Sequence, residues 1–282
     1  MPESFRIDSI QRKMQILQIY THSNLRNFSY ILFEEQSREA ICIDPFYADQ
    51  IRKNLEARNL HLKFIINTHE HQDHVCGNED LLFLYKGVEV LAHPNAKDKV
   101  PGFTTGLKAG DSLNLGDKDK ALEVLDTPGH TFSHLCLLYK EKGVAKGLFS
   151  GDTLFNAGVG NCRNGGKPEV LFETVYKHFY KLQNEVVLYP GHDYLENNLA
   201  FSLFIEPDNE TVLQLQNEIK ALKKDFEFLQ LNMEMERKIN TFLRCDRPSD
   251  FMKFNLEKAF RGIKTDEAKG LFLALRKLRD VW

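Results

Sequence analysis

The sequence predicts a layered α/β or α+β domain with more strand than helix, followed by a smaller helical domain. Short β-rich runs separated by turns occupy residues 14–191, and apolar residues at helical spacing dominate after Pro207. The chain has 282 residues, of which 42% are hydrophobic and 27% are charged. This composition is that of a globular protein, and the length allows one large domain or two modest ones.

Nine runs in the first part have the composition of β-strands, and turn residues such as Pro45, Pro94 and Gly129 separate them. The expected strands are 14–20, 28–35, 40–44, 62–68, 88–93, 122–127, 135–139, 147–150 and 185–189. The segments 48–58 and 170–182 have the apolar spacing of helices. Strands alternating with helices in this way favour a layered architecture.

Beyond about residue 200 the apolar residues recur every three or four positions, as on one face of a helix. One expected helix presents Val212, Leu215, Ile219, Leu222 and Phe226 on its apolar face, with Lys220, Lys223 and Lys224 in solvent. A second begins near Asp266 and presents Leu271, Leu275, Leu278 and Trp282. We therefore divide the chain into a polar arm (1–13), a larger domain (14–199) and a helical domain (200–282).

The charge and the cysteines limit the classes of function. With 37 basic and 40 acidic residues, the net charge of -3 leaves no general attraction for nucleic acid or anionic membranes. The first 13 residues have no apolar core of a signal peptide, and no apolar run reaches about 18 residues. Five scattered cysteines without a Cys-x-x-Cys pair indicate a reducing compartment. We expect a cytoplasmic monomer that binds neither nucleic acid nor membranes.

Four possible metal ligands lie within six positions directly after the apolar run 62–66: His69, His71, Asp73 and His74. A loop at the end of a strand can bring such side chains to one point. Imidazole and carboxylate groups are ligands for zinc, iron or manganese. A solvated polar turn is the alternative, but four such residues so close together argue against it.

Three more candidates, His130, Asp152 and His192, each follow a glycine at the end of an apolar run. Functional side chains of layered folds gather at the ends of strands. Each residue alone could be a cap or an ordinary hydrogen-bonding group. Together with the first cluster, however, they make the seven ligands that a two-metal site needs.

These motifs resemble the metallo-β-lactamase superfamily and, within it, glyoxalase II, the hydroxyacylglutathione hydrolases. The matching motifs are His-x-His-x-Asp-His at 69–74, Thr-Pro-Gly-His at 127–130, Gly-Asp-Thr-Leu-Phe at 151–155 and Gly-His-Asp-Tyr at 191–194. The resemblance covers residues 14–282. It implies an αββα four-layer sandwich as the catalytic domain and a C-terminal helical domain that binds substrate.

The resemblance also implies a role for each candidate ligand. One divalent metal would be held by His69, His71 and His130, and a second by Asp73, His74 and His192. Asp152 would bridge the two ions, so we expect Asp73 and Asp152 to act in catalysis. His134, four residues after His130, is expected to support the ligands or to pack rather than to bind metal. The metals themselves, zinc, iron or manganese, stay open.

The C-terminal part carries the resemblance to glyoxalase II in particular. Residues 240–244 resemble the Asn-Pro-Phe-Leu-Arg motif of that family, and residues 275–282 resemble its closing helix. This implies that Arg276 and Arg279 contact the thiol carrier. Tyr194, beside His192, matches a substrate-contacting tyrosine of the family, and packing is the alternative for a tyrosine at a strand end. The spacing of three places both arginines on one helical face, opposite the Leu/Trp stripe. On spacing alone, a solvated basic face near a helix end is the alternative.

The chain also departs from the family pattern. After residues 158–160 the family has a basic residue and, two positions on, an aromatic that contact glutathione, whereas this chain has Asn161 and Arg163. Arg163 could supply the missing charge from its shifted position, or the loop could suit another thiol. Glu70 replaces a histidine that points away from the metals in the family.

The implied reaction is hydrolysis of S-D-lactoylglutathione to D-lactate and glutathione at a two-metal centre. A persulfide dioxygenase with one iron at His69, His130 and Asp152 is the main alternative, because two histidines and one carboxylate suit iron that reacts with oxygen. A binding protein with an unused site is a third interpretation. A nuclease is disfavoured, since the chain lacks a basic stripe.

Overall fold

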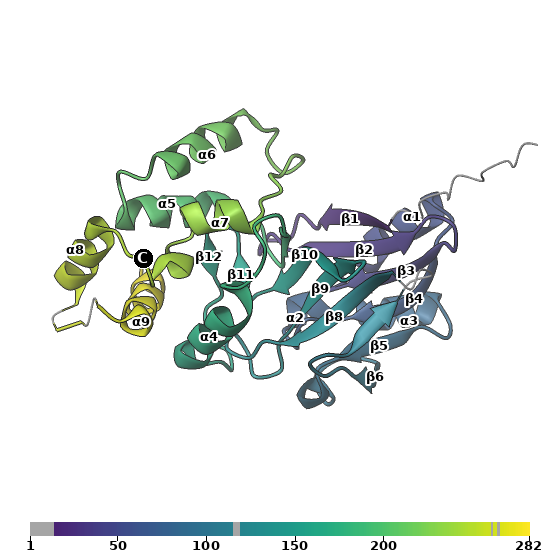
Figure 1. The fold of residues 1–282 in the computed structure, drawn as a ribbon. Helices are drawn as coiled ribbons and strands as arrows, with labels where there is room; N and C mark the ends of the chain where they lie inside the picture. Colours follow the sequence, from purple (N-terminus) through teal and green to yellow (C-terminus); the bar gives the residue numbers. More distant parts are fainter. Residues whose placement is uncertain (1–13, 115–118, 261, 264–265) are drawn as a thin grey trace, which may run out of the picture.

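The computed structural model describes residues 14–114, 119–260, 262–263 and 266–282. The expected polar arm, residues 1–13, lies outside the described residues. Figure 1 shows two stacked β-sheets, with most of the C-terminal helices gathered at one end of them. No helix in the described part of the chain combines the length and the apolar character needed to cross a membrane.

The first sheet has six strands in the order β1-β2-β3-β4-β5-β6. Its strands are β1 (Met14–Tyr20), β2 (Phe28–Glu34), β3 (Glu39–Ile43), β4 (His61–Ile66), β5 (Glu89–Ala92) and β6 (Phe103–Gly106). The first three are antiparallel, and β3 to β6 are parallel. Parallel neighbours need crossover connections, which contain α1 (Ala48–Ala57), α2 (Gln72–Val75), α3 (Asn78–Leu84) and the short turn η1 (Pro94–Ala96).

The second sheet has five strands in the order β13-β10-β9-β8-β7. They are β7 (Ser112–Asn114), β8 (Lys120–Asp126), β9 (Leu135–Glu141), β10 (Val144–Gly151) and β13 (Val187–Pro190). Only the β10–β13 pair is parallel. A separate hairpin, β11 (Leu154–Phe155) with β12 (Gly158–Val159), connects this sheet to the helices.

The apolar side chains show that the layers are stacked as predicted. Tyr30 and Ile41 of the first sheet pack against Leu137 and Phe149 of the second. On the outer side of the first sheet, Ile51 of α1 packs in a separate core. The outer side of the second sheet packs against α4 (Pro168–Thr174) and the C-terminal helices. The αββα four-layer prediction is therefore confirmed.

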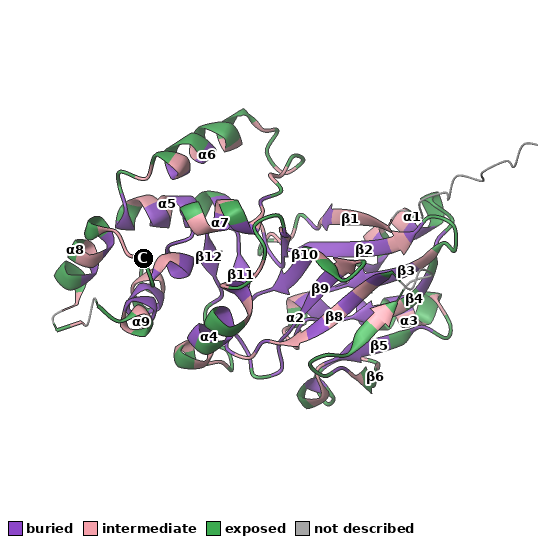
Figure 2. Cartoon of the chain, viewed as in Figure 1, coloured by how far each residue is buried: buried purple, intermediate pink, exposed green. Residues whose placement is uncertain are grey.

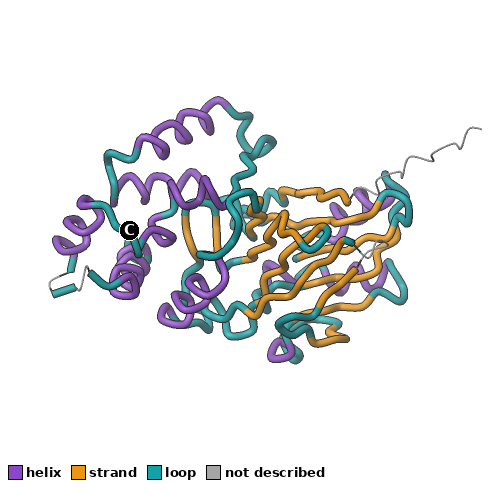
Figure 3. The backbone as a smooth tube through the Cα atoms, in the orientation of Figure 1, coloured by secondary structure: helices purple, strands orange, loops and turns teal. Residues whose placement is uncertain are grey.

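The C-terminal region is helical and has no sheet of its own among the described residues. It contains α5 (Leu195–Ile205), α6 (Glu210–Ala221), α7 (Met233–Ile239), the 3-10 turn η3 (Thr241–Arg244), α8 (Asp250–Ala259) and α9 (Ala268–Arg279). Figure 2 shows that the helices are buried on their inner sides, and Figure 3 shows the long loop between α6 and α7. Helix α5 escaped prediction because apolar Ala200, Leu203 and Phe204 lie on the side opposite its buried residues, which removes the one-sided pattern.

The structure corrects the prediction for the helix expected to end at Phe226. Helix α6 ends at Ala221, and the Phe226 side chain lies in the following loop with 65% of its surface exposed. Leu222 is extended, and Asp225 has a positive φ of 65°, so the helical path cannot continue. Lys223 and Lys224 consequently lie in the loop rather than on the helix.

Two other helix predictions were wrong in part. The segment 170–182 is not one α-helix, because α4 ends at Thr174 and a π-helical turn, η2 (Val175–Phe179), follows it. Trp282 lies beyond the end of α9, where its ring packs edge-on against Phe201. The tail therefore ends in an aromatic contact with α5 rather than in a continued helical stripe.

Candidate metal centre and adjoining pocket

The candidate ligands come from loops that follow strands of both sheets. Strand β4 leads into the loop and short helix α2 that carry the His69–His74 cluster. Strands β8, β10 and β13 lead to His130, Asp152 and His192. Because these strand ends meet at one edge of the sandwich, residues far apart in the sequence converge there.

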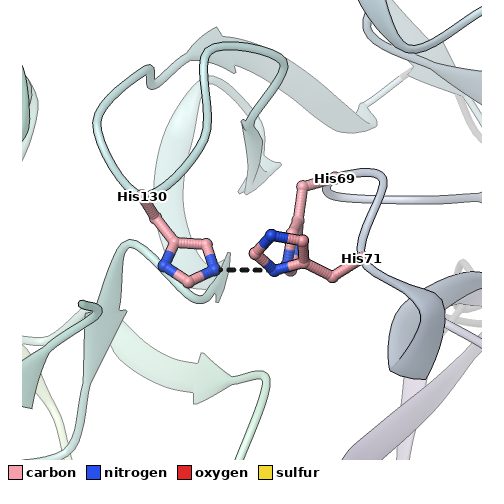
Figure 4. Close-up of side chains that lie close together, drawn as sticks. All are labelled: His69, His71 and His130. Atoms are coloured by element: carbon pink, nitrogen blue, oxygen red, sulfur yellow. Dashed lines mark hydrogen bonds between the residues drawn. The ribbon is translucent and has the colours of Figure 1, made fainter. Parts of the chain in front are cut away.

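The first group of ligand atoms consists of three histidines (Figure 4). His69 Nε2 lies 3.0 Å from His71 Nδ1, and His130 Nε2 lies 3.1 Å from the same nitrogen. The three donor atoms lie within 4.8 Å of one another. This is the spacing of ligands that surround a single ion.

The second group consists of one carboxylate and two histidines. His74 Nε2 lies 3.2 Å from His192 Nε2. Asp73 Oδ2 lies 3.4 Å from each of these nitrogens. The ligand atoms of these three residues also lie within 4.8 Å of one another, so they form a second potential metal site.

Asp152 lies between the two groups. Its Oδ1 is 3.4 Å from His74 Nε2, while its Oδ2 is 3.4 Å from His130 Nε2 and 3.2 Å from His192 Nε2. Oδ1 is buried and has no hydrogen-bond partner among the described residues. A Cβ at Gly191 would clash with this oxygen, so only glycine permits the close approach of the backbone here. A buried, unpartnered carboxylate oxygen fits a cation.

Each ligand imidazole uses its other ring nitrogen for a hydrogen bond that points away from the centre. Nδ1 makes this outer hydrogen bond in four of the rings and Nε2 in His71, so the other ring nitrogen faces inward. The acceptors are Thr68 Oγ1 for His69, Asn164 O for His71, Asp44 Oδ2 for His74, Asn161 O for His130 and Leu25 O for His192. Metal-binding histidines are oriented in this way, and the donor set therefore fits divalent cations.

Burial lowers the pKa of His69 well below its usual value, which keeps this imidazole neutral. Beside the carboxylates the electrostatics instead favour positive charge. Burial also lowers the pKa of His74, but Asp152, Asp44 and Asp73 more than compensate and raise it to about 10. For Asp152, burial raises the pKa, but His192 and His74 lower it more, so the carboxylate stays charged. A bound cation would satisfy these carboxylates in place of a proton.

Sequence analysis missed Asp44, which supports the cluster from the end of β3. Its Oδ1 accepts a hydrogen bond from Thr68 N, and its Oδ2 accepts from Thr68 Oγ1 and His74 Nδ1. Asn27 was also missed, and its Nδ2 donates to Asp73 Oδ2 over 2.8 Å. Asp44 has the same position directly after a strand as the candidate ligands, which was a usable signal.

His134 and Glu70 take positions outside the ligand groups. His134 Nε2 accepts a hydrogen bond from Asp152 N, and its Nδ1 faces Thr127 and Thr153. It therefore supports the backbone of Asp152. Glu70 accepts from Thr131 Oγ1 and pairs with Lys99, so its carboxylate is engaged at the side of the site.

A cavity of about 220 Å³ adjoins the ligand groups, and all five predicted substrate-binding residues line it. Its lining residues are Phe155, Val159, Asn161, Arg163, Tyr194, Asn198, Arg276, Arg279 and Asp280. The Tyr194 ring stacks on His192 with centroids 4.8 Å apart. The cavity therefore begins directly beside the second ligand group.

The arginines differ from the prediction of a face opposite the apolar stripe. Arg276 is only 4% exposed; its Nη1 donates to Val159 O over 2.8 Å, and its Nη2 pairs with Asp280 Oδ1 over 2.8 Å. Helix α9 packs against the β11–β12 hairpin on this side, which buries the side chain. Arg279 donates to Asn198 Oδ1 and lies over the rings of Phe201 and Trp282. Both guanidinium groups still border the cavity.

The two residues that depart from the family pattern lie at the rim of this cavity. The carbonyl of Asn161 accepts a hydrogen bond from His130 Nδ1 over 2.6 Å, and its side chain accepts one from Arg163 N. Arg163 is exposed and donates to the Asp280 carbonyl. Arg163 thus links the loop after β12 to the end of α9.

Comparisons with known proteins agree with this architecture. Residues 26–192 match the metallo-beta-lactamase superfamily, and residues 193–282 match the hydroxyacylglutathione hydrolase C-terminus. A protein from Nitrosococcus oceani named hydroxyacylglutathione hydrolase is 43% identical over 270 residues, which cover 95% of this chain and 100% of the relative. One with the same name from Polaromonas is 37% identical with the same coverage.

Solved structures share the fold at lower identity. ETHE1 from Myxococcus xanthus is 20% identical with a TM-score of 0.62, covering 95% of this chain and 99% of its own. TTHA1623 in a di-iron-bound form is 25% identical with a TM-score of 0.51, covering 64% of this chain and 96% of its own. The two family matches and the full-length relatives show that the chain belongs to the hydroxyacylglutathione hydrolase family of the metallo-beta-lactamase superfamily.

Proposed function

We propose that this enzyme hydrolyses glutathione thioesters at a two-metal centre, with S-D-lactoylglutathione as the substrate. The observation that carries the proposal is the position of Asp152 between two groups of inward-facing ligand atoms, beside a cavity bordered by arginines. The names of the relatives supply the reaction and the thiol carrier.

In this proposal the two ligand groups each hold a divalent cation. His69, His71 and His130 hold one, Asp73, His74 and His192 hold the other, and Asp152 is shared. Nitrogen and oxygen ligands of this kind accept zinc, iron or manganese. The di-iron-bound form of TTHA1623 supports the number of ions.

Two divalent cations held by these residues would supply Lewis acidity for activating water and for polarising the thioester carbonyl. Asp152 accepts hydrogen bonds only, so it can orient a water and keeps the two ligand groups at a fixed separation. In the reaction a bond forms between the water oxygen and the acyl carbon, and the carbon–sulfur bond breaks. The leaving thiolate has an ordinary pKa of about 8.5, so it needs little help from an acid.

The side chains around the cavity hold the thiol carrier. We assign this role to Tyr194, Arg276, Arg279, Asn161 and Arg163. Guanidinium groups recognise carboxylates with two parallel hydrogen bonds, and glutathione carries carboxylates at both ends. Residues 14–199 then serve as the catalytic domain and residues 200–282 as the substrate-binding domain.

The persulfide dioxygenase alternative uses fewer of the residues that converge. It requires His69, His130 and Asp152 alone, whereas the second ligand group would have no role. The match of residues 193–282 to the hydroxyacylglutathione hydrolase C-terminus also favours the hydrolase. A monomeric state and a cytoplasmic location stay predictions of the sequence.

The test is hydrolysis of S-D-lactoylglutathione by the purified, metal-loaded protein, with thioester loss and thiol release followed together. We expect equal amounts of both, and a kcat about 10³-fold lower in the Asp152→Asn variant. A parallel reaction with glutathione persulfide measures oxygen uptake. Oxygen uptake without thioester hydrolysis by a metal-loaded protein would replace the proposal with the dioxygenase.

A further inference from the structure

The loop between β1 and β2 holds two members of the second ligand group. The Leu25 carbonyl accepts a hydrogen bond from His192 Nδ1 over 2.7 Å. Asn27 Nδ2 donates to Asp73 Oδ2 over 2.8 Å. The backbone of this loop also pairs with the segment around His192, since Asp193 N donates to Arg26 O over 2.9 Å. The position of this loop therefore sets the positions of Asp73 and His192.

Arg26, between Leu25 and Asn27, is the residue that anchors this loop. It has a positive φ of 59°, which is uncommon for a side chain of this size. Its Nη2 pairs with Asp193 Oδ2 over 2.5 Å, and its Nη1 pairs with Asp225 Oδ1 over 2.9 Å. The guanidinium carbon also lies 5.2 Å from the centre of the Tyr20 ring. These three contacts outweigh an unfavourable backbone conformation.

Asp225 lies in the loop between α6 and α7. This loop is part of the helical tail, the segment that contains α5 to α9. This loop crosses back to the first sheet, where Phe228 meets the ring of Phe28 at 5.0 Å and that of Tyr20 at 4.9 Å. Its own turn is closed by a hydrogen bond from Lys223 N to Glu227 Oε2. Asp225 is thus presented to Arg26 by a packed loop rather than by a free chain segment.

The first ligand group has different supports. His69, His71 and His130 donate to Thr68, Asn164 and Asn161, which lie in the loops after β4 and β12. The ion pair between Arg26 and Asp225 therefore bears on one ligand group and not on the other.

We propose that Arg26 is a positioning residue through which the helical tail holds the second metal-binding group in shape. This inference rests on the proposed two-metal function. It implies that the two metal positions differ in their dependence on the tail. Loss of Arg26 should weaken binding of one metal and leave the other unchanged.

The experiment is titration of the metal-free, full-length protein with Zn²⁺ alone, in competition with a chelator of known affinity. The variants are Arg26→Gln, which removes both ion pairs, and Asp225→Asn, which removes one charge. Asparagine tolerates a positive φ, so the second variant changes the charge without straining the turn. The control is Glu56→Gln, which removes an exposed ion pair with Arg52 of 2.8 Å on α1.

We expect two Zn²⁺ per chain in the unchanged protein and in the control. In Arg26→Gln the affinity for one Zn²⁺ should fall about tenfold, the lower end of the effect of outer partners of metal ligands. Asp225→Asn should weaken the same position by a smaller factor. Thermal unfolding checks that each metal-free variant is folded. If Arg26→Gln does not fold, the Zn²⁺ affinities of Asp225→Asn test the proposal.

The outcomes separate the two proposals. Fewer than two Zn²⁺ in the unchanged protein would contradict the proposed two-metal function. Two Zn²⁺ with unaltered affinities in both folded variants would refute the role of Arg26 alone. Equal weakening of both positions would also refute it, since it would show a general loss of structure.

Discussion

The sandwich and the helical tail contribute differently to the same site. All seven candidate ligands come from the sandwich, whereas the tail contacts the backbone around them. The β11–β12 hairpin, which follows Asp152, is held from the tail at several atoms. Glu236 accepts from Ala157 N, Asn240 donates to Gly158 O, Asn198 donates to Asn156 O and Arg276 donates to Val159 O.

These four tail residues are polar and buried. Buried polar groups require hydrogen-bond partners, and here the partners are backbone atoms of the hairpin. The position of the hairpin, and with it the wall of the substrate cavity, therefore depends on the tail. The comparison teaches that the sandwich supplies the metal ligands, whereas the tail sets the substrate wall and, through the ion pair of Asp225 with Arg26, bears on one ligand group.

The largest effect is expected from Asp152→Asn in the sandwich. The change weakens a ligand atom that faces both groups, so we expect the stabilisation of the transition state to fall by several kcal/mol, or about 10³-fold in kcat. The measurement is kcat together with the metal content of the purified variant. Unchanged metal content and turnover would contradict the shared role.

Asp44→Asn tests the sandwich one step further from the metals. The asparagine side chain has only one acceptor oxygen, so it cannot accept the hydrogen bonds from both Thr68 and His74. The imidazole of His74 is then no longer held in a fixed orientation. We expect metal affinity to fall by about 10- to 100-fold, as for other outer partners. Chelator competition measures this, with the exposed Asp49→Asn as control. A fall of similar size in the control would show a general charge effect.

Arg276→Met and Arg279→Met compare two positions of the tail. Both should raise KM about tenfold, because each loses a charge-assisted hydrogen bond to substrate. Only Arg276→Met should also lower stability, by about 1–3 kcal/mol, since Val159 O and Gly160 O lose their buried donor. Steady-state kinetics and thermal unfolding separate the two effects. Equal stability of the two variants would show that the hydrogen bonds of Arg276 do not stabilise the fold.

Glu236→Gln tests the tail through pH. Burial raises the pKa of Glu236 from 4.5 to about 8. The folded state therefore binds a proton that the unfolded state releases, and this contribution to stability is lost as pH rises from about 4.5 to about 8. Glutamine carries no such proton. Between about pH 5 and about pH 8, the melting temperature of Glu236→Gln should therefore rise relative to that of the unchanged protein. A difference in melting temperature that does not change with pH would contradict the raised pKa of Glu236.

The smallest effect is expected from Arg163→Ala at the rim. The side chain is exposed, so its attraction for a carboxylate is screened and should be about 0.2–1 kcal/mol. We expect KM to rise about two- to fivefold at low salt, and the difference to shrink at high salt. A large loss in kcat instead would show that Arg163 orients the reacting group.

The sequence by itself determined the donor types and their approximate place. His69, His130, Asp152 and His192 follow apolar runs that form strands, and strand ends of a layered fold meet at one edge. These signals are local, so they survive without a structure. The αββα layers could be predicted from the motifs, whereas short strands such as β11 and β12 could not, because two residues carry no pattern.

Only the tertiary structure decided which atoms face the centre and what holds them. The inward nitrogen of each histidine depends on an acceptor from another segment, such as Leu25 O for His192. The burial of Arg276 depends on the hairpin that packs against α9, and helical spacing alone pointed to the wrong face. The ion pair of Arg26 with Asp225 joins the start of the sandwich to the middle of the tail. Such contacts depend on the folded path of the chain, which no local pattern specifies.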